Sequence, residues 1–201
     1  MSILRLYSLP GTRRVLLSLL LINVGFSAAA CGEPGAEPSG PGTAFSIAGR
    51  TYQLQNAVQY GLPAVLREIS GLALDDEERL YGHDDELAVI YQIDFNAGRV
   101  LKRFAFEDTR KDDFEGIAWL DNSLYMTTST GKLFEFSVGA ADALVPYRVV
   151  ADGMDCEVEG LGRSPDRTGL IAACKNRPKG KKALHFHAWP PGAAAWPDKP
   201  V

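Results

Sequence analysis

The sequence predicts an all-β protein made of β-propeller blades, each built from four antiparallel strands. Its 201 residues include 20 glycines and 12 prolines, a composition typical of many short strands joined by turns. A short motif, in which an acid or hydroxyl residue precedes a glycine and an aliphatic residue, recurs at Gly71, Gly116 and Gly160, at steps of 45 and 44 residues. Four short strands in about 40–45 residues is the size of one propeller blade.

Each copy of the motif is expected to lie on the first strand of a blade. The copies span residues 68–73 (EISGLA), 113–118 (DFEGIA) and 157–162 (EVEGLG). Apolar runs after a polar turn indicate second strands at 80–81, 124–126 and 170–172. Alternating segments indicate third strands at 89–93, 133–136 and 184–187, and two copies add a fourth strand, at 100–104 and 147–150. The helical period of 3.6 residues is missing, which argues against a helical repeat of similar length.

Three blades predict an incomplete ring, because known propellers have about four to eight blades. Residues 45–54 are expected to supply an odd outer strand, whereas the proline-rich segment 189–201 is unsuited to a further blade. The chain is therefore expected to be a shortened relative of a longer protein, or to complete its propeller by self-association with a second copy. Open sheet edges would make such an arc prone to aggregation.

The first 30 residues have the three-part layout of an export signal. Arg5, Arg13 and Arg14 precede an apolar stretch at 15–25, and small residues follow it up to Cys31. The alternative, a transmembrane helix, needs about 20 apolar residues, more than this stretch provides. The sequence therefore predicts a signal peptide at 1–30 and an exported protein.

The junction at Cys31 resembles the lipobox of bacterial lipoproteins, in which the cysteine becomes the acylated first residue of the mature chain. Residues 32–43 contain only Gly, Pro, Glu, Ala, Ser and Thr and indicate a flexible tether. We expect a lipidated Cys31 with this tether (31–43), a partial propeller domain at 44–201, and anchoring to a membrane in the periplasm or at the cell surface. Ordinary cleavage to a soluble periplasmic form is the alternative, because Ala28 stands where such boxes usually have Leu.

The net charge of the chain bears on its class of partner. The formal net charge is -4, and removal of the three leader arginines lowers it to about -7, which disfavours nucleic acid as a partner.

If Cys31 is acylated, Cys156 and Cys174 remain. In an oxidising compartment they would form one disulfide, and the alternative is two buried free thiols.

Acidic residues gather around the three motif glycines. In each copy, residues two apart would share one face of a strand, and convergence of the first strands would crowd carboxylates near the axis. Hard oxygen ligands of this kind suit Ca²⁺. The candidate metal ligands are Glu68, Asp85, Glu86, Asp113, Glu115, Glu157 and Glu159. The alternative is that these acids are solvated strand ends, and that the glycines only relieve crowding between blades.

Three stretches that carry the repeat resemble the SdiA-regulated family of extracytoplasmic proteins. They are REISGLAL with LYGHDDELAVIYQID, DDFEGIAW with LYMTTSTGKLFEF, and EVEGLG with LIAACKN and KKALHF, within residues 67–189. This family is similar to the esterase-like domain of certain phytases. The resemblance implies a propeller of five or six blades with an acidic channel that binds calcium, and no assigned reaction. This chain departs from the pattern by ending after about three blades.

Two functions follow as hypotheses. The first is a calcium-compatible propeller lipoprotein that binds a ligand or an envelope partner without catalysis. The alternative is a metal-dependent phosphoesterase or esterase, for which His83 would be the general base, unless it is a surface-loop histidine, and Lys175 or Arg177 would bind phosphate. The sequence has no G-x-S-x-G elbow, no P-loop and no HExxH helix, so no catalytic residue is assigned.

Overall fold

The computed structural model describes residues 3–7, 44–47, 50–53, 57–176 and 182–201. The apolar core of the predicted signal (15–25), Cys31 and the tether (32–43) lie outside the described residues. In the part of the chain that is described, no helix has the length and apolar character needed to cross a membrane. The chain divides into two compact units, Ile3–Tyr60 and a unit that contains Gly61–Val201.

The first unit contains short paired strands. Strand β1 (Ile3–Tyr7) pairs with β4 (Ala57–Gly61), and β2 (Ala44–Ile47) pairs with β3 (Arg50–Gln53) in an antiparallel hairpin. The segment expected to supply an outer strand to a blade thus forms a two-stranded sheet of its own. Residues 44–60 belong to this unit, and the blades lie in the unit that contains Gly61–Val201.

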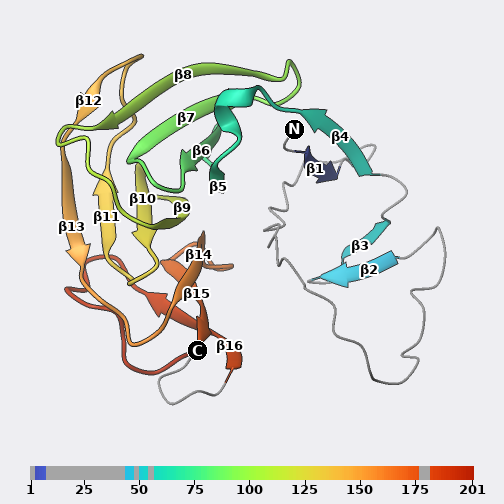
Figure 1. Cartoon of the computed structure of the whole chain (residues 1–201). Coiled ribbons are helices and arrows are strands. Elements are labelled where there is room, and N and C mark those ends of the chain that lie inside the picture. Colours follow the sequence, from blue (N-terminus) through green and yellow to red (C-terminus); the bar gives the residue numbers. More distant parts are fainter. Residues whose placement is uncertain (1–2, 8–43, 48–49, 54–56, 177–181) are drawn as a thin grey trace, which may run out of the picture. The chain divides into compact units, whose positions relative to one another are not determined.

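Three antiparallel sheets form the second unit and correspond to the three sequence repeats (Figure 1). Blade 1 follows a short 3-10 helix, η2 (Ala64–Leu66), and consists of β5 (Ile69–Leu74), β6 (Leu80–Asp84), β7 (Val89–Asp94) and β8 (Arg99–Phe106). Blade 2 consists of β9 (Phe114–Leu120), β10 (Ser123–Thr128), β11 (Leu133–Phe136) and β13 (Tyr147–Ala151). Blade 3 consists of β14 (Val158–Arg163), β15 (Leu170–Asn176) and β16 (Lys182–Trp189). The predicted all-β class and the incomplete propeller are confirmed.

The connections within each blade are simple. In every blade, consecutive strands pair antiparallel from the first strand outward. The short strand β12 (Leu144–Val145), which precedes β13 in the chain, pairs parallel with β8 at the outer edge of blade 1. This pairing links the outer edge of blade 1 to the connection between the last two strands of blade 2.

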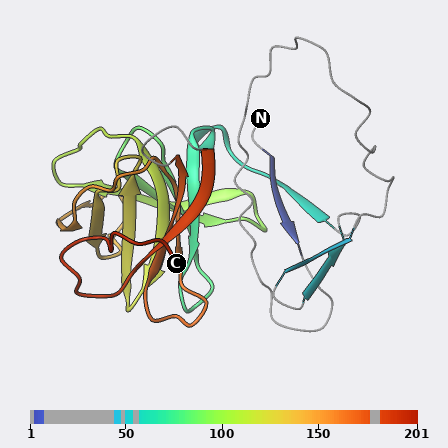
Figure 2. The same ribbon diagram turned by 90° about the horizontal axis from the view of Figure 1, so that it is seen from below.

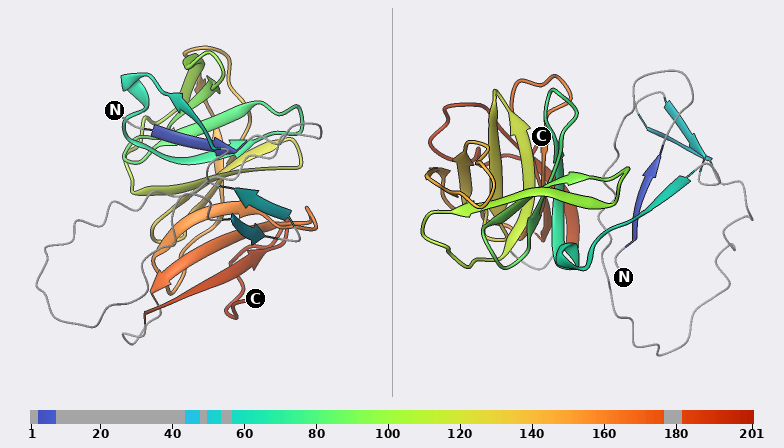
Figure 3. Two further views of the ribbon diagram at one scale, coloured as in Figure 1. Left: turned by 90° about the vertical axis from the view of Figure 1, so that its right-hand side faces the viewer. Right: turned by 90° about the horizontal axis from the view of Figure 1, so that it is seen from above.

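The first strands of the three blades lie side by side on the inner side of the arc. Strand β9 contacts both β5 and β14, and β5 also contacts β14. Figure 1 shows the yellow strands of blade 2 between the green strands of blade 1 and the orange strands of blade 3, and Figure 2 and Figure 3 show the same sheets from other sides. The repeats therefore bring equivalent positions of the motif together, as the sequence predicted.

Two apolar cores lie between successive blades. The core between blades 1 and 2 is rich in aromatic residues, among them Phe104, Phe106, Phe114 and Phe134, which are at most 1% exposed. The core between blades 2 and 3 contains Leu120, Tyr125, Leu133, Ala151, Val158, Leu170, Ala172, Cys174, Trp189 and Trp196. Because each core draws on two sheets, no blade buries its apolar face alone.

The proline-rich tail closes the second core. No strand follows β16 in the described residues. Trp196 is 7% exposed and its indole N–H donates to the Gly131 carbonyl in blade 2, at 2.7 Å. The expectation that this tail forms no further blade is confirmed, and the structure shows that the tail instead covers the core between blades 2 and 3.

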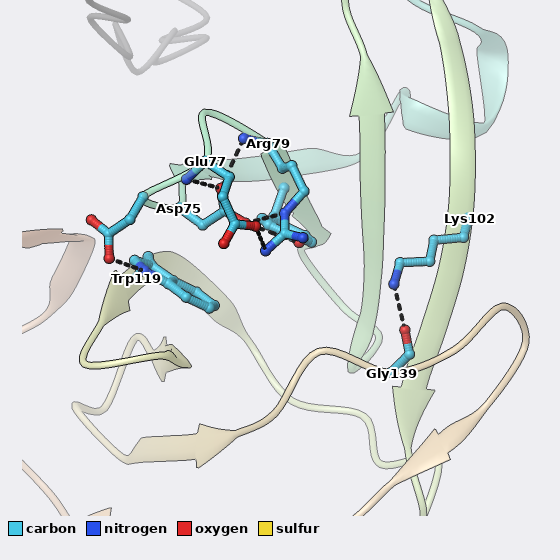
Figure 4. Close-up of polar contacts among 8 residues, drawn as sticks. Asp75, Glu77, Arg79, Lys102, Trp119 and Gly139 are labelled. Atoms are coloured by element: carbon cyan, nitrogen blue, oxygen red, sulfur yellow. Dashed lines mark hydrogen bonds and ion pairs between the residues drawn. The ribbon is translucent and has the colours of Figure 1, made fainter.

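Polar contacts join the blades at the carboxyl ends of the first strands. The turn after β5 is organised by Asp75, which accepts hydrogen bonds from the backbone of Glu77 and Arg79 (Figure 4). Its neighbour Asp76 accepts a hydrogen bond from Trp119 Nε1 of blade 2 at 3.0 Å. Figure 4 also shows Lys102 of β8, which donates to the Gly139 carbonyl of blade 2 at 2.7 Å.

Asp76 also joins blade 1 to blade 3. Its Oδ1 atom lies 3.0 Å from Arg163 Nη1 and 2.9 Å from Arg167 Nη2. The hydrogen bond from Trp119, and then the one from Arg163, lower the pKa of Asp76. One carboxylate therefore connects all three blades at this end of the first strands.

Candidate functional site

A repeated backbone ladder organises the opposite, amino-terminal ends of the first strands. The carbonyl of Glu68 accepts a hydrogen bond from the N–H of Asp85 (3.0 Å), and the carbonyl of Asp85 accepts one from Phe114 of the next blade (2.7 Å). The same two bonds recur one blade later, from Ser129 to Asp113 and from Val158 to Ser129. Blade 3 repeats the first bond, from Lys175 to Glu157 (2.8 Å). The ladder makes Glu68, Asp113 and Glu157 equivalent, and likewise Asp85, Ser129 and Lys175.

A β-bulge precedes the motif glycine in every blade. In blade 2, Gly116 pairs with Thr127 but Phe114 pairs with Thr128, so Glu115 is the extra residue. The register shifts in blades 1 and 3 leave Ser70 and Glu159 as the extra residues. A bulge interrupts strict alternation and redirects a side chain. Strand alternation alone therefore does not predict on which face of the sheet the acids two residues apart lie. Their contacts in the structure show which of them lie together.

Glu115 lies at the centre of the acidic group. Its half-buried position raises its pKa to about 7, and the nearby Asp113 and Glu159 carboxylates and a hydrogen bond with Asp113 act in the same direction. The ammonium of Lys175 opposes this shift. Carboxylates crowded in a partly desolvated place disfavour ionisation unless a cation compensates them. Near neutral pH, Glu115 is therefore a carboxyl group that exchanges a proton readily.

Lys175 supplies a cation to the same group. Its Nζ atom lies 2.8 Å from Glu159 Oε1 and 3.6 Å from Glu157 Oε1. The Glu159 carboxylate, ahead of Glu157, raises the pKa of Lys175. Asp113, Glu115, Glu157, Glu159 and Lys175 are called the acidic group below. With every residue ionised it holds four negative charges and one positive charge.

The remaining predicted ligands, Glu68, Asp85 and Glu86, belong to blade 1. Asp85 interacts with Glu68, and its pKa is raised by burial and then by the neighbouring Asp84 and Glu68. Its Oδ1 atom is buried and has no hydrogen-bond partner. Glu86 is exposed, and its backbone N–H donates to Asp84. The seven predicted acids thus divide into the acidic group, the pair of Glu68 and Asp85, and the separate Glu86.

His83 is not the surface-loop residue or accessible base that the sequence suggested. It lies on β6 and is 0% exposed. Its Nδ1 is 2.9 Å from the Asp84 carbonyl, so this nitrogen carries the proton, and Nε2 is buried without a hydrogen-bond partner. Burial lowers the pKa of His83 to about 4. A neutral, enclosed imidazole cannot exchange protons with an outside substrate, so the general-base hypothesis for His83 is wrong.

The motif glycines have different steric roles. A methyl group on Gly116 would lie 2.3 Å from the backbone nitrogen of Leu161 in blade 3, and one on Gly71 would lie 2.6 Å from His83 Nε2. A methyl group on Gly160 would meet nothing within 4 Å. Close approach of the first strands therefore requires glycine at Gly116, whereas Gly160 has room for a side chain.

The third blade contains a second cluster, which the sequence analysis recognised only in part. Cys156 and Cys174 are joined by a disulfide, one of the two states expected from the sequence. Among the described residues, a close grouping of three or more metal-ligating side chains occurs here and includes none of the seven acids: Cys156, Cys174, His185 and His187. The sequence predicted His185 and His187 only as part of the third strand of this blade, although the H-x-H spacing places both side chains on one face.

Comparison with known proteins gives structural neighbours but no family. No family model and no curated protein matches the chain. A PQQ-bound aldose sugar dehydrogenase from Streptomyces coelicolor aligns over 59% of this chain with 14% identity and a TM-score of 0.40. Hydrazine synthase from Kuenenia stuttgartiensis aligns over 79% of this chain with 16% identity and a TM-score of 0.44. The chain spans 42% of each of these structures.

Proposed function

We propose that this chain is an exported, lipid-anchored protein of the bacterial cell envelope whose propeller blades bind a cationic ligand, Ca²⁺ in the first place, without catalysing a reaction. Cys31 after the export signal would carry the lipid. The acidic group would bind the ligand. The relationship to SdiA-regulated proteins is part of this proposal and rests on the repeated motifs around Gly71, Gly116 and Gly160.

One feature carries the binding function: the acidic group has more carboxylates than Lys175 balances, and burial together with this excess raises the pKa of Glu115 to about 7. A cation bound to Glu115 would replace its proton, and would offset both the burial of the carboxylate and its repulsion by Asp113 and Glu159, which raise its pKa. Carboxylate oxygens fit the preference of Ca²⁺ for hard ligands. Because the carboxylates are not already gathered as one ligand set, we expect weak affinity, with a Kd of about 10⁻⁴–10⁻³ M as in extracellular calcium modules.

Calorimetric titration of the purified full chain with CaCl₂ at pH 8 and pH 6 tests this proposal. Ca²⁺ would compete with one proton on Glu115, whose pKa is about 7, so binding should be about tenfold weaker at pH 6 than at pH 8. Glu115→Gln should weaken binding at pH 8 and abolish the pH dependence, while the exposed Glu107→Gln serves as the matched control and should change neither. No binding of millimolar Ca²⁺ at pH 8, or equal affinity at both pH values, would refute the proposal.

The envelope location has a separate test. Mass spectrometry of the membrane fraction should find the mature chain beginning at an acylated Cys31, and Cys31→Ser should release the protein into the soluble fraction. A protein that is cut elsewhere and remains soluble would support the alternative of a soluble periplasmic form. Self-association is likewise a proposal, and light scattering on the solubilised protein would measure it.

A metal-dependent esterase or phosphoesterase remains the second candidate. One observation favours it: a carboxyl group with a pKa of about 7 beside a lysine is poised for proton transfer near neutral pH. In that function Glu115 would exchange the proton, Lys175 would bind an anionic substrate, and the remaining carboxylates would hold the metal. Turnover of ester or phosphate substrates that Glu115→Gln abolishes would establish it, whereas Ca²⁺ binding without turnover favours the binding protein.

A further inference from the structure

Strands β15 and β16 of blade 3, with the segment just before β14, bring two cysteines and two histidines to one place. Cys174 on β15 pairs directly with His185 on β16, and His187 lies two residues further along the same strand. Cys156 stands two residues before Val158, which pairs with Cys174 from the other side. Residues directly opposite each other, and residues two apart on one strand, share a sheet face. The potential ligand atoms of the four side chains accordingly lie within 4.8 Å of one another.

The surroundings of His187 are those of a metal-binding histidine. It is 8% exposed, and its Nδ1 atom lies 3.0 Å from the Pro197 carbonyl in the tail. A carbonyl only accepts hydrogen bonds, so Nδ1 carries the proton and Nε2 keeps the lone pair. Metal-ligating histidines typically donate their second nitrogen to a carbonyl or carboxylate in this way, which orients the ring.

The apolar shell completes the comparison with structural metal sites. Cys174 is fully buried in the core between blades 2 and 3, and Cys156 packs partly buried against the same core. Ala172, which pairs with His187, is a small residue buried in the same core. Two thiolates and two imidazoles are the ligand set of one class of four-coordinate structural zinc sites.

We propose that Cys156, Cys174, His185 and His187 form a Zn²⁺ site when the cysteines are reduced, and that the disulfide is the metal-free, oxidised state of the same site. A dithiol donates two electrons and two protons to the disulfide and leaves as its own cyclic disulfide, so that two protein thiols form. Zn²⁺ then binds both sulfurs as thiolates and releases two protons to solvent. Zn–S bonds of about 2.3 Å hold tetrahedral sulfurs nearly 4 Å apart, so the disulfide and the metal exclude each other.

This site is distinct from the acidic group. Zinc prefers sulfur and imidazole nitrogen, whereas the acidic group offers only hard oxygen ligands. The two proposals therefore make separate predictions, and either can fail while the other stands.

Metal binding by the full chain carrying Cys31→Ser tests the proposal, because Cys156 and Cys174 are then its only thiols. The chain is prepared oxidised, or reduced with a phosphine that is then removed without air, and titrated with Zn²⁺ and with Co²⁺ as a spectroscopic substitute. We expect one metal per reduced chain, with thiolate-to-cobalt charge transfer and the strong visible bands of tetrahedral Co²⁺. The oxidised chain should show neither signal.

Ligand variants separate this site from adventitious thiol binding. His187→Ala and His185→Ala should each weaken binding at least about tenfold. His83→Gln replaces the remaining histidine of the chain and should retain the charge-transfer signal. If a variant unfolds, a second measurement still decides: Zn²⁺ should protect the thiols of the reduced wild-type protein from re-forming the disulfide, and a chelator should restore oxidation. Failure of the reduced chain to bind Zn²⁺, or binding by both histidine variants as tight as that of the chain with both histidines, would overturn the proposal.

Discussion

Glu115→Gln should stabilise the protein above neutral pH and leave its stability nearly unchanged in weak acid. The folded chain raises the pKa of Glu115 from its ordinary 4.5 to about 7. Between these values the folded state holds a proton that the unfolded state has lost, so wild-type stability falls as the pH rises from 4.5 to 7. Glutamine resembles the protonated carboxyl group in shape, is uncharged, and still donates a hydrogen bond towards Asp113.

The size of the effect follows from the same two values. A difference between 4.5 and about 7 corresponds to roughly 3 kcal/mol at 1.36 kcal/mol per pKa unit. Because Glu115 is only half-buried, solvent reduces the cost of its burial and screens its repulsion by neighbouring carboxylates, and we expect about 1–1.5 kcal/mol of stabilisation at pH 8. Urea unfolding of the wild type and the variant at pH 5 and pH 8, without added divalent cations, measures it.

The pH dependence is what decides this prediction. Glu107→Gln removes one charge at an exposed position and should change the free energy of unfolding by the same small amount at both pH values. A Glu115→Gln variant that is equally shifted at pH 5 and pH 8, or that is destabilised at pH 8, would refute the proposed crowding of Glu115 with Asp113 and Glu159.

Three further predictions concern the contacts between blades. Gly116→Ala should lower the free energy of unfolding, measured in urea, by about 1–3 kcal/mol, because its methyl group would meet the Leu161 backbone. Gly160→Ala is the control and should stay within about 0.5 kcal/mol of wild type. Equal effects of the two substitutions would contradict the close approach at Gly116. Asp76→Asn should lower the free energy of unfolding by about 0.5–1 kcal/mol above pH 4. Because the pKa of Asp76 is lowered in the folded state, this loss should shrink as the pH falls below 4, and salt should also reduce it by screening the ion pairs. A loss that is insensitive to pH and salt would argue against these ion pairs. Because burial lowers the pKa of His83 to about 4, NMR should show a neutral His83 at pH 5. For the same reason the free energy of unfolding should fall as the pH drops from 6.5 towards 4. A His83 signal that titrates near pH 6.5 would contradict its burial.

The blades were predictable from the sequence because the repeat fixes which residues are equivalent. The step from Gly71 to Gly116 to Gly160 assigned the first strand of every blade, and the alternating segments assigned the third strands. Second strands were predicted too short. In blade 1 the strand continues through His83 to Asp84, because polar residues there pair with the bulged end of β5 instead of forming a loop. The acids after His83 made the segment look exposed, which explains the wrong hypothesis for that residue.

The site was less predictable, for two physical reasons. A β-bulge adds one residue without changing the composition of the strand, so the sequence gives no sign that Glu115 and Glu159 interrupt the alternation. The second cluster combines Cys156 from the segment before β14 with Cys174 and two histidines from β15 and β16. Only the strand register joins them, and register depends on where the bulges fall. The H-x-H spacing at His185 was the one local signal available.

The backbone ladder also shows why the three blades do not form three equal sites. The positions of Asp85, Ser129 and Lys175 are equivalent in the ladder but carry an acid, a hydroxyl and a cation. Lys175 neutralises part of the charge on Glu157 and Glu159 in blade 3, whereas no cation occupies the equivalent position in blade 1 or blade 2. Blade 1, with Glu68 and Asp85, and blade 2, with Asp113 and Glu115, therefore carry acids without a cation at this position. Glu115 interacts with carboxylates of blades 2 and 3, whereas Glu157 is already paired with Lys175, so substitution of Glu115 should weaken cation binding more than substitution of Glu157.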